Sequence, residues 1–382
     1  FIGNEISKLP EGNYFIKNEL DTSKTEEIFI GFGLASYAYN FYNQRNLFNV
    51  KLLISKNIDF KKILNFLKSE YMVRNLVNTP ASELGPENFE KFLNLFSEKN
   101  NFSFKSHSET KFLKANFPLI FEVGKGSFEK PRLIEMTFGN KKGFKITLIG
   151  KGVCFDTGGL NIKSSASMNT MKKDMGGAAN IIGLAKLIVS CNLPVYLRVL
   201  IPIVENSISK ESFRPSDILT SRNGTTIEIN NTDAEGRLIL ADALSYADEE
   251  KFDLLICMAT LTGAARVALG EDIAPFFTNN ENFAKVITEK SKECFDPVWR
   301  LPFYYPYRIS IKSDIANLDN APKGGMAGSI KAALFLKEFV KNDKNFIFFD
   351  IFSWSNSNKP GKAKGGVMQG VRSLFLLIEK LC

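Results

Sequence analysis

The sequence predicts an α/β protein with a mixed, mostly parallel central sheet, helices on both faces and a small N-terminal α/β domain. Three observations lead to this prediction. Strand-length apolar segments alternate with helix-length segments from about residue 70 onward. The strand segments are apolar throughout, as in strands buried on both faces. The composition, 44% hydrophobic and 24% charged, is that of an ordinary globular protein.

The first part of the chain predicts the small domain, which we place at residues 1–70. It reads as short strands and one polar, aromatic helix, LASYAYNFYNQR at 34–45. The stretch GFGLAS at 31–36 partly matches a dinucleotide-binding loop, but one glycine pair is weak evidence for such a site. The chain begins with Phe instead of Met, so we expect the natural N-terminus to be missing.

The remainder, residues 71–382, predicts the larger domain. Hydrophobic periodicity and Pro positions predict helices at 60–77, from Pro86, and at 176–190, 237–250 and 329–340. Uninterrupted apolar runs predict strands at 145–150, 195–203, 253–261 and 346–351.

Several protein classes can be set aside. No apolar run approaches the roughly 18 residues that a membrane span needs, and the first residues do not follow the plan of a secretory signal. Five scattered cysteines without CxxC spacing suggest free thiols in a reducing cytosol, so we expect a cytoplasmic protein. The net charge of +8 could attract an anionic partner, but the lysine pairs at 61–62, 141–142 and 172–173 resemble dispersed surface charge. We therefore expect no nucleic-acid partner.

Histidine is scarce in this chain. The single one, His107, lies in the polar stretch FKSHSETKF, which predicts a surface loop or helix. A Ser-His-Asp or Cys-His mechanism, or a histidine-rich zinc site, would have to rely on this residue alone.

One short acidic segment carries the first chemical signal. In NTDAEGR, residues 231–237, Asp233, Glu235 and Arg237 occupy alternate positions directly before a predicted helix. An extended backbone would send all three to one side. Because two close carboxylates repel, a positive group must lie between them, and a metal ion is the usual one.

A second acidic loop follows the strand at 145–150. Its sequence, KGVCFDTGGLNIK at 151–163, offers Lys151, Asp156 and Lys163, and Asp174 comes shortly afterwards in DMGGAAN. Ligands of open α/β sheets bind beyond the carboxyl ends of the strands, where this loop must lie.

Each of these residues also has an ordinary structural interpretation. Asp174 could be a helix N-cap, Glu235 could simply favour a helix dipole, and Lys151 and Lys163 could be solvated surface lysines. Together, four carboxylates and two lysines are enough for a pair of divalent ions that prefer oxygen ligands.

These segments resemble a known family. NTDAEGRL, GKGVCFDTGGLNIK and MKKDMGGAAN are similar to the signature segments of the leucyl (cytosol) aminopeptidases, the M17 metallopeptidases. RNLVNTPASELGPE (74–87), ATLTGA (259–264) and SDIANLDN…GGMAGSIKAALFL also match, so the resemblance covers roughly residues 70–382. It implies that the N-terminal domain here is reduced or truncated, because the domain of the family is usually much longer.

The resemblance implies a site for two divalent ions, with zinc, manganese and magnesium all open. Lys151, Asp156, Asp174 and Glu235 would hold one ion, and Asp156, Asp233 and Glu235 the other. A lysine ligand must be neutral, and a nearby dication supplies the energy for its deprotonation.

The resemblance also implies how the site works. The ions would polarise the scissile carbonyl and lower the pKa of a bridging water, and one of them would bind the free α-amine of the peptide. Lys163 would stabilise the oxyanion, and Arg237 would hold a bicarbonate ion as the proton shuttle.

The substrate of this family is a short peptide. Met171, Thr260 and Gly263 match residues that line the side-chain pocket of the family, which predicts removal of leucine-like N-terminal residues. The resemblance also implies a homohexamer. One departure affects the pocket, because Phe352 stands where a small residue is common.

Two alternatives remain at this point. A nucleic-acid-binding regulator with little or no peptidase role would exploit the net charge of +8. A two-metal phosphoesterase would share the carboxylates, but it would not explain Lys151 or Arg237.

Overall fold

A central nine-stranded sheet organises the chain and confirms the predicted fold class. The computed structural model describes residues 2–17, 20–43, 49–54, 58–322 and 324–382. The strands of this sheet are β3 (Ser103–His107), β4 (Arg132–Phe138), β5 (Phe144–Gly150), β6 (Gly152–Asp156), β7 (Val195–Asn206), β10 (Leu254–Ala259), β11 (Ala274–Phe277), β12 (Val298–Arg300) and β14 (Phe346–Asp350).

The middle of the sheet is parallel and its margins are mixed. The strand order is β12-β11-β14-β10-β5-β7-β4-β3, and β6 also pairs with β7. Strands β14, β10, β5 and β7 run parallel to their neighbours within this group, whereas β4 and β3 add antiparallel pairs at one margin and β11 pairs antiparallel with β14. Parallel strands need crossover connections, and the helices supply them.

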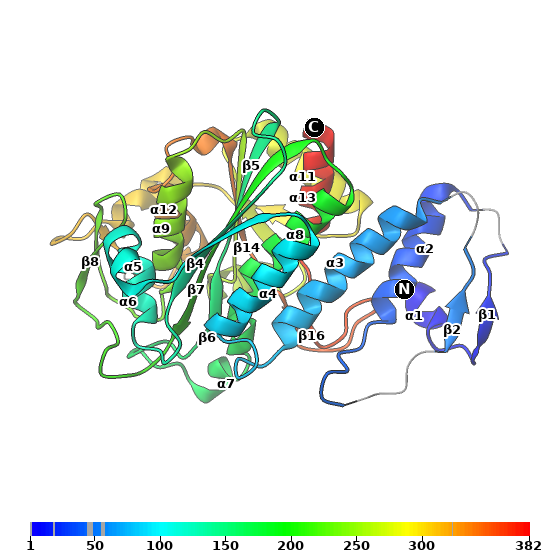
Figure 1. Ribbon diagram of the computed structural model, residues 1–382, viewed down its shortest axis with the longest axis horizontal. Helices are drawn as coiled ribbons and strands as arrows, with labels where there is room; N and C mark the ends of the chain where they lie inside the picture. Colours follow the sequence, from blue (N-terminus) through cyan, green and yellow to red (C-terminus); the bar gives the residue numbers. More distant parts are fainter. Residues whose placement is uncertain (1, 18–19, 44–48, 55–57, 323) are drawn as a thin grey trace.

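Helices cover both faces of the sheet (Figure 1). One face carries α3 (Phe60–Asn78), α4 (Pro86–Lys99), α8 (Gly176–Ser190), α11 (Glu281–Glu293) and α13 (Val371–Leu381). The other carries α5 (Thr110–Asn116), α6 (Pro118–Gly124), α9 (Gly236–Asp248) and α12 (Gly328–Lys337). Alternate residues of one strand therefore enter two different cores: Ile146 and Leu148 of β5 join the first, and Ile149 joins the second.

Short elements complete the larger part of the chain. They are α7 (Ser165–Met168), α10 (Gly263–Leu269), the 3₁₀ helices η1 (Met171–Met175), η2 (Tyr305–Ile311) and η3 (Asp343–Asn345), and the strands β8 (Ile218–Thr220), β9 (Thr226–Glu228), β13 (Leu318–Asp319), β15 (Trp354–Ser355) and β16 (Gly365–Gly366).

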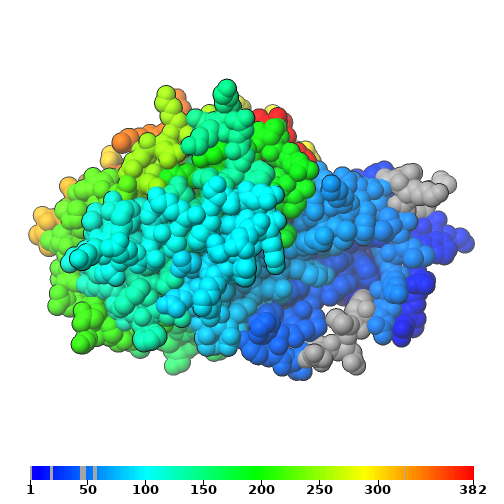
Figure 2. Space-filling view, in the orientation of Figure 1, coloured from blue at the N-terminus to red at the C-terminus, as the bar shows by residue number. Residues whose placement is uncertain are grey.

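The first elements form a lobe at one end of the molecule (Figure 2). They are α1 (Ile2–Ile6), β1 (Gly12–Tyr14), α2 (Thr22–Ala35) and β2 (Val50–Leu52). The prediction of a helix at 34–45 is wrong for the described residues 36–43, and residues 44–45 lie outside the described part of the chain. Tyr37 lies in a non-helical segment there, and its hydroxyl donates to Asn75 Oδ1 of α3 at 2.9 Å. This tertiary contact replaces the predicted helix.

Helix α3 connects the lobe to the larger body. It continues without a break through residue 70, where we placed the domain boundary, and it packs against both α2 and α8. The division into residues 1–70 and 71–382 stays a prediction. In the part of the chain that the structure describes, no helix has both the length and the apolar character required to cross a bilayer.

The prediction for His107 is wrong. It ends β3 and is only 6% exposed, with its ring stacked on Phe112 and its Nε2 atom 3.7 Å from Glu135 Oε2. Although the sequence of this segment is mostly polar, it forms a strand in which His107 is buried.

Candidate active site

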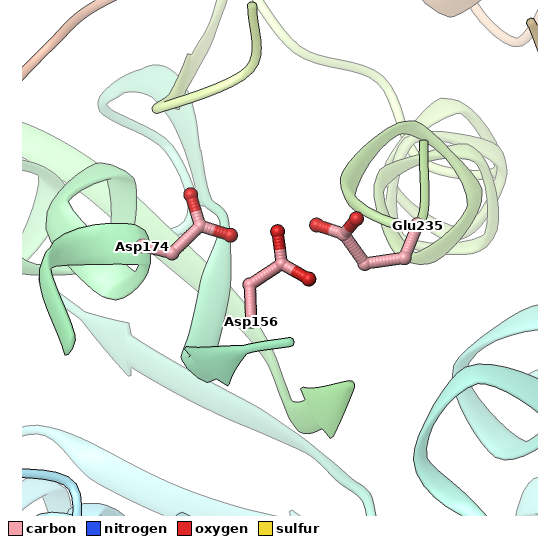
Figure 3. A group of neighbouring side chains, drawn as sticks. All are labelled: Asp156, Asp174 and Glu235. Atoms are coloured by element: carbon pink, nitrogen blue, oxygen red, sulfur yellow. The ribbon is translucent and has the colours of Figure 1, made fainter. Parts of the chain in front are cut away.

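Three buried carboxylates meet at the carboxyl ends of the central strands (Figure 3). Asp156 ends β6, Asp174 lies in η1, and Glu235 directly precedes α9. Each of them offers one oxygen, and these three oxygens all lie within 4.8 Å of one another. The two acidic segments, far apart in the sequence, therefore converge as predicted.

Lys151 lies among these acids. Its Nζ atom is 2.7 Å from Asp174 Oδ2 and 2.9 Å from Glu235 Oε1, and the residue is only 3% exposed. Burial alone would lower the pKa of Lys151, but Asp174, Glu235 and Asp156 together raise it above its ordinary value. The interpretation of Lys151 as a solvated surface lysine is thus wrong.

Lys163 approaches the same cluster from another loop. Its Nζ atom lies 2.8 Å from Asp156 Oδ2 and also contacts Asp233 Oδ1. The side chain of Lys163 is 13% exposed, and that of Asp233 is 34% exposed, so this pair borders the cavity. Burial and the neighbouring Asp156 raise the pKa of Asp233.

Some oxygens of these acids form no hydrogen bond. Both carboxylate oxygens of Glu235 and Oδ2 of Asp174 are buried without a hydrogen bond to any described residue, and Lys151 forms ion pairs with Glu235 Oε1 and Asp174 Oδ2. Burial and Asp156 raise the pKa of Glu235, which is the cost of gathering these charges. Buried carboxylate oxygens that lack donors fit divalent cations.

The segment 231–237 reaches the site in an unexpected way. It is not extended: Thr232 and Asp233 lie in a turn, and Glu235 already has helical angles of φ −72° and ψ −36°. Gly236 then allows a close approach, because a Cβ atom there would lie 2.5 Å from Cε of Lys151. The close approach of Lys151 therefore explains why residue 236 is a glycine, which the spacing of the charged residues alone did not explain.

Asp174 and Glu235 do not act as ordinary caps. The residue that precedes α8 is Met175, and neither α8 nor α9 has a side-chain cap hydrogen bond. Asp174 Oδ1 instead accepts from Thr260 Oγ1 at 2.8 Å, and the Thr260 carbonyl accepts from Lys151 Nζ at 3.1 Å. Thr260 therefore positions two of the charged groups as well as lining the cavity.

Asn206 is a site residue that the sequence did not reveal. It ends β7, and its Nδ2 atom donates to Asp156 Oδ1 at 2.8 Å and to the Thr232 carbonyl at 3.2 Å. This buried amide fixes the carboxylate of Asp156 relative to the segment that carries Asp233. Its position at the end of a long apolar strand could have indicated from the sequence that Asn206 belongs to the site.

A cavity of about 1010 Å³ opens beside the carboxylates. Its wall includes the three residues that we expected to line a side-chain pocket, Met171, Thr260 and Gly263. Arg237 also borders it, with the guanidinium carbon 5.9 Å from the centre of the Phe335 ring and Nε without a hydrogen bond in the described chain. Burial lowers the pKa of Arg237, although the adjacent acids oppose this shift.

Lys173 is a second residue that the sequence misplaced. We assigned the pair 172–173 to the surface, but Lys173 is 3% exposed and lines the cavity. Its pKa is lowered to about 8, chiefly by burial; Asp174 opposes this shift and Arg266 adds to it. The position of the pair between Met171 and Asp174 could have placed one of its lysines in the site, but the sequence does not indicate which one.

The fold and the site together define a metal-dependent α/β enzyme, because clustered carboxylates lie beyond the carboxyl ends of a mostly parallel sheet. Residues 71–375 match the model of the cytosol aminopeptidase family, catalytic domain. The chain belongs to this family.

Known relatives agree with this assignment. The cytosol aminopeptidase of Encephalitozoon cuniculi is 38% identical over 362 residues, covering 93% of this chain and 74% of the relative. A crystal structure of the cytosol aminopeptidase from Coxiella burnetii is 41% identical with a TM-score of 0.96, covering 99% of this chain and 83% of that one. The bottromycin maturation enzyme BotP, in complex with Mn, is 27% identical with a TM-score of 0.92, over 100% and 86% of the chains. The chain is thus a metallo-aminopeptidase, a hydrolase of peptide N-termini.

Proposed function

We propose that this protein removes single N-terminal residues from short peptides with the help of two divalent ions. The observation that carries the proposal is the buried group of Asp156, Asp174 and Glu235, with oxygens within 4.8 Å of one another and with Lys151 among them. When bound, the ions supply Lewis acidity toward the scissile carbonyl and lower the pKa of the attacking water. Zn²⁺, Mn²⁺ and Mg²⁺ are all suited to such oxygen-rich ligands, and BotP is the relative described with Mn.

The ligands would divide into two overlapping sets. Lys151, Asp156, Asp174 and Glu235 would hold one ion, and Asp156, Asp233 and Glu235 the other. The geometry of Glu235 supports a bridging role, because its Oε2 atom is buried without a hydrogen bond to any described residue while Oε1 faces Lys151. The greater exposure of Asp233 supports its place on the cavity side of the pair.

Two cationic residues would act on the reacting peptide. Lys163, anchored to Asp156 and Asp233 at the border of the cavity, would donate to the developing oxyanion. Arg237 would hold a bicarbonate ion, since a buried guanidinium with a free Nε–H suits a planar oxyanion. When held by Arg237, this ion would supply a group that can accept and donate a proton.

The side chain of the substrate would enter the cavity beside Met171, Thr260 and Gly263. The apolar surface of Met171 supports acceptance of leucine-like residues. The proposal also includes a cytoplasmic location, supported by five cysteines that are all free.

A homohexamer is part of the same proposal. Exposed apolar side chains between residues 299 and 309 support self-association, because monomeric proteins rarely leave such side chains clustered at the surface. They include Trp299 at 60% and Ile309 at 81% exposure. Light scattering of the purified protein would measure the mass of the assembly.

The requirement for a free amine tests the function directly. Leu-peptides should be cleaved by the metal-loaded protein, whereas their N-acetylated forms should react at least about a hundredfold more slowly, because the acyl group removes the amine lone pair. Release of leucine from both series is measured by chromatography. Comparable rates for the two series would contradict an exopeptidase.

A further inference from the structure

Two cationic side chains in the cavity wall lie against one aromatic ring. The Nζ atom of Lys173 is 5.0 Å from the centre of the Phe352 ring, and the guanidinium carbon of Arg266 is 4.3 Å from the same centre. All three residues line the cavity. The ring therefore holds two positive charges near each other, although like charges repel.

These two cations differ from the lysines of the carboxylate cluster. Lys151 and Lys163 form ion pairs, but the side chains of Lys173 and Arg266 form no ion pair or hydrogen bond with any residue that the structure describes. Lys173 is only 3% exposed, and a cation largely removed from water without an anionic partner is costly; Arg266 is half-buried beside it. The arrangement thus leaves a place for an anion.

The nearby acids already have other partners. Asp174, which attracts both cations, accepts from Thr260 and contacts Lys151. Asp350 accepts from backbone N–H groups of the 260–262 segment and from two hydroxyl groups. Glu271, another acid of the cavity wall, lies 2.5 Å from Lys359 Nζ. The missing anion would therefore come from outside the chain.

We propose that Lys173 and Arg266 form a subsite for a carboxylate on the first residue of the substrate, so that peptides beginning with Glu or Asp are favoured over their neutral amide counterparts. The inference rests on the proposed function. Lys173 follows Met171 by two residues, and Arg266 lies one turn after Gly263 in α10, so the two cations belong to the wall assigned above to the substrate side chain. Phe352 positions both cations.

The decisive measurement compares isosteric substrates. We expect the kcat/KM of the metal-loaded protein for a Glu-aminomethylcoumarin substrate to exceed that for its Gln counterpart by about tenfold or more, since a hydrogen-bonded charge pair is formed in one case only. The Leu substrate reports whether the protein is an aminopeptidase at all. No hydrolysis of any of the three would contradict the proposed function, whereas Leu hydrolysis with a Glu/Gln ratio near one would overturn the subsite alone.

Variants assign the preference to the two cations. Arg266→Gln and Lys173→Met should each lower the Glu/Gln ratio at least about fivefold, and either variant carries the test if the other fails to fold. Arg214→Gln is the matched control, because it removes the same charge from a side chain that is 71% exposed and paired with Asp217 outside the cavity wall. An equal loss of the ratio in this control would overturn the assignment, because net charge would then be its cause.

Two further readouts complete the test. Calorimetry on the metal-free protein should show tighter binding of L-glutamate than of L-glutamine, with the difference lost in Arg266→Gln. Kinetics with Leu-Gly and Leu-Gly-amide separate the two possible sources of the carboxylate. If Arg266→Gln lowers the Leu-Gly/Leu-Gly-amide ratio and leaves the Glu/Gln ratio unchanged, the cations contact the C-terminus of the peptide and the side-chain assignment is wrong.

Discussion

Lys151 and Lys163 approach one carboxylate cluster from different sides and differ in exposure. Lys151 is enclosed between Asp174 and Glu235, whereas Lys163 borders the cavity beside Asp233. A metal ligand must lie among the acids, whereas a hydrogen-bond donor to the substrate must face the cavity. Their environments therefore support different roles for the two lysines.

Removal of Lys163 should affect the chemical step. The charge that it meets develops mainly in the transition state, so Lys163→Ala should lose on the order of 10²–10³ in kcat with KM close to normal. Its metal content, measured by atomic absorption, should equal that of the wild type. The matched variant Lys151→Ala should instead lose or loosen one ion. A metal-depleted Lys163→Ala, or one that retains more than about a tenth of wild-type kcat, would refute the assignment.

At the scale of elements, the start of α9 is built around one close contact. Gly236→Ala would place a methyl group 2.5 Å from Cε and 2.7 Å from Nζ of Lys151. Because the clash is with the flexible end of a lysine, we expect a stability change within about 1 kcal/mol but a loss of roughly a hundredfold in kcat/KM, as the ammonium is displaced. Thermal unfolding and kinetics measure the two effects.

A second glycine provides the control for this variant. Gly31 lies inside α2, and a methyl group there would have its nearest neighbours at 3.9 Å. Gly31→Ala should keep full activity and gain up to about 1 kcal/mol from helix propensity. If Gly236→Ala is as active as Gly31→Ala, the close contact does not position Lys151.

A buried acid joins α9 to α6 and to the turn between β8 and β9. Asp242 of α9 accepts hydrogen bonds from the backbone N–H groups of Leu119 and Ile120 in α6 and of Arg222. Burial raises the pKa of Asp242 from 3.8 to about 7, although these three donors oppose the shift. In the folded state the acid therefore holds its proton at pH values where the unfolded chain has lost it.

The sign of the pH dependence follows from this pKa. The stabilisation is present in full below pH 4 and is lost as the pH rises through 7, so from pH 5 to 7 the unfolding free energy should fall by roughly 2–3 kcal/mol from this group. Asp242→Asn does not titrate and should lack this contribution. Urea unfolding of both proteins at several pH values isolates it, because the other groups are shared. If the unfolding free energies of the wild type and of Asp242→Asn changed with pH in parallel, this would contradict a buried, protonated Asp242.

Sequence periodicity predicted most helices and strands of the larger body because burial there follows the repeat of each element. The helix at 176–190 was predicted with its observed bounds, and Asp156, Asp174 and Glu235 come together from the two acidic segments. Tertiary contacts decided the failures: Tyr37 bonds to α3 where a helix was predicted, and aromatic packing buries His107. Lys173 was missed because the sequence does not indicate which lysine of a pair faces a cavity.

At the scale of the whole molecule, the site depends on long-range assembly. Its acids come from β6, η1 and the start of α9, and the cavity wall adds segments near residues 260 and 352. Ions bound by this arrangement would stabilise the folded chain only. Metal binding and unfolding should consequently be linked.

Metal removal tests this linkage. Chelation should abolish activity and lower Tm, and Mn²⁺ or Zn²⁺ should restore both, with about 2.7 kcal/mol of added stability at a hundred times Kd. Glu235→Gln should show a much smaller metal-dependent rise in Tm, because it weakens a proposed bridge. Calorimetric scans at increasing metal concentration give the measurement. Full activity in a rigorously metal-free preparation would refute the two-ion mechanism.

The continuity of α3 has a consequence for chimaeric proteins. Phe66 and Val73 of this helix belong to the core of the larger body, while Tyr71 donates to the Gly33 carbonyl of α2. The lobe is therefore attached through a helix that it shares with the larger body, and not through a flexible linker. A lobe transplanted from a relative should be accepted only when the junction lies before Asp59, the N-cap of α3, and the new α2 preserves the close fit of Gly33 against Leu67. A junction at residue 70 would fall inside α3. It would place Phe66 and Val73, two residues of one core, in segments from different proteins.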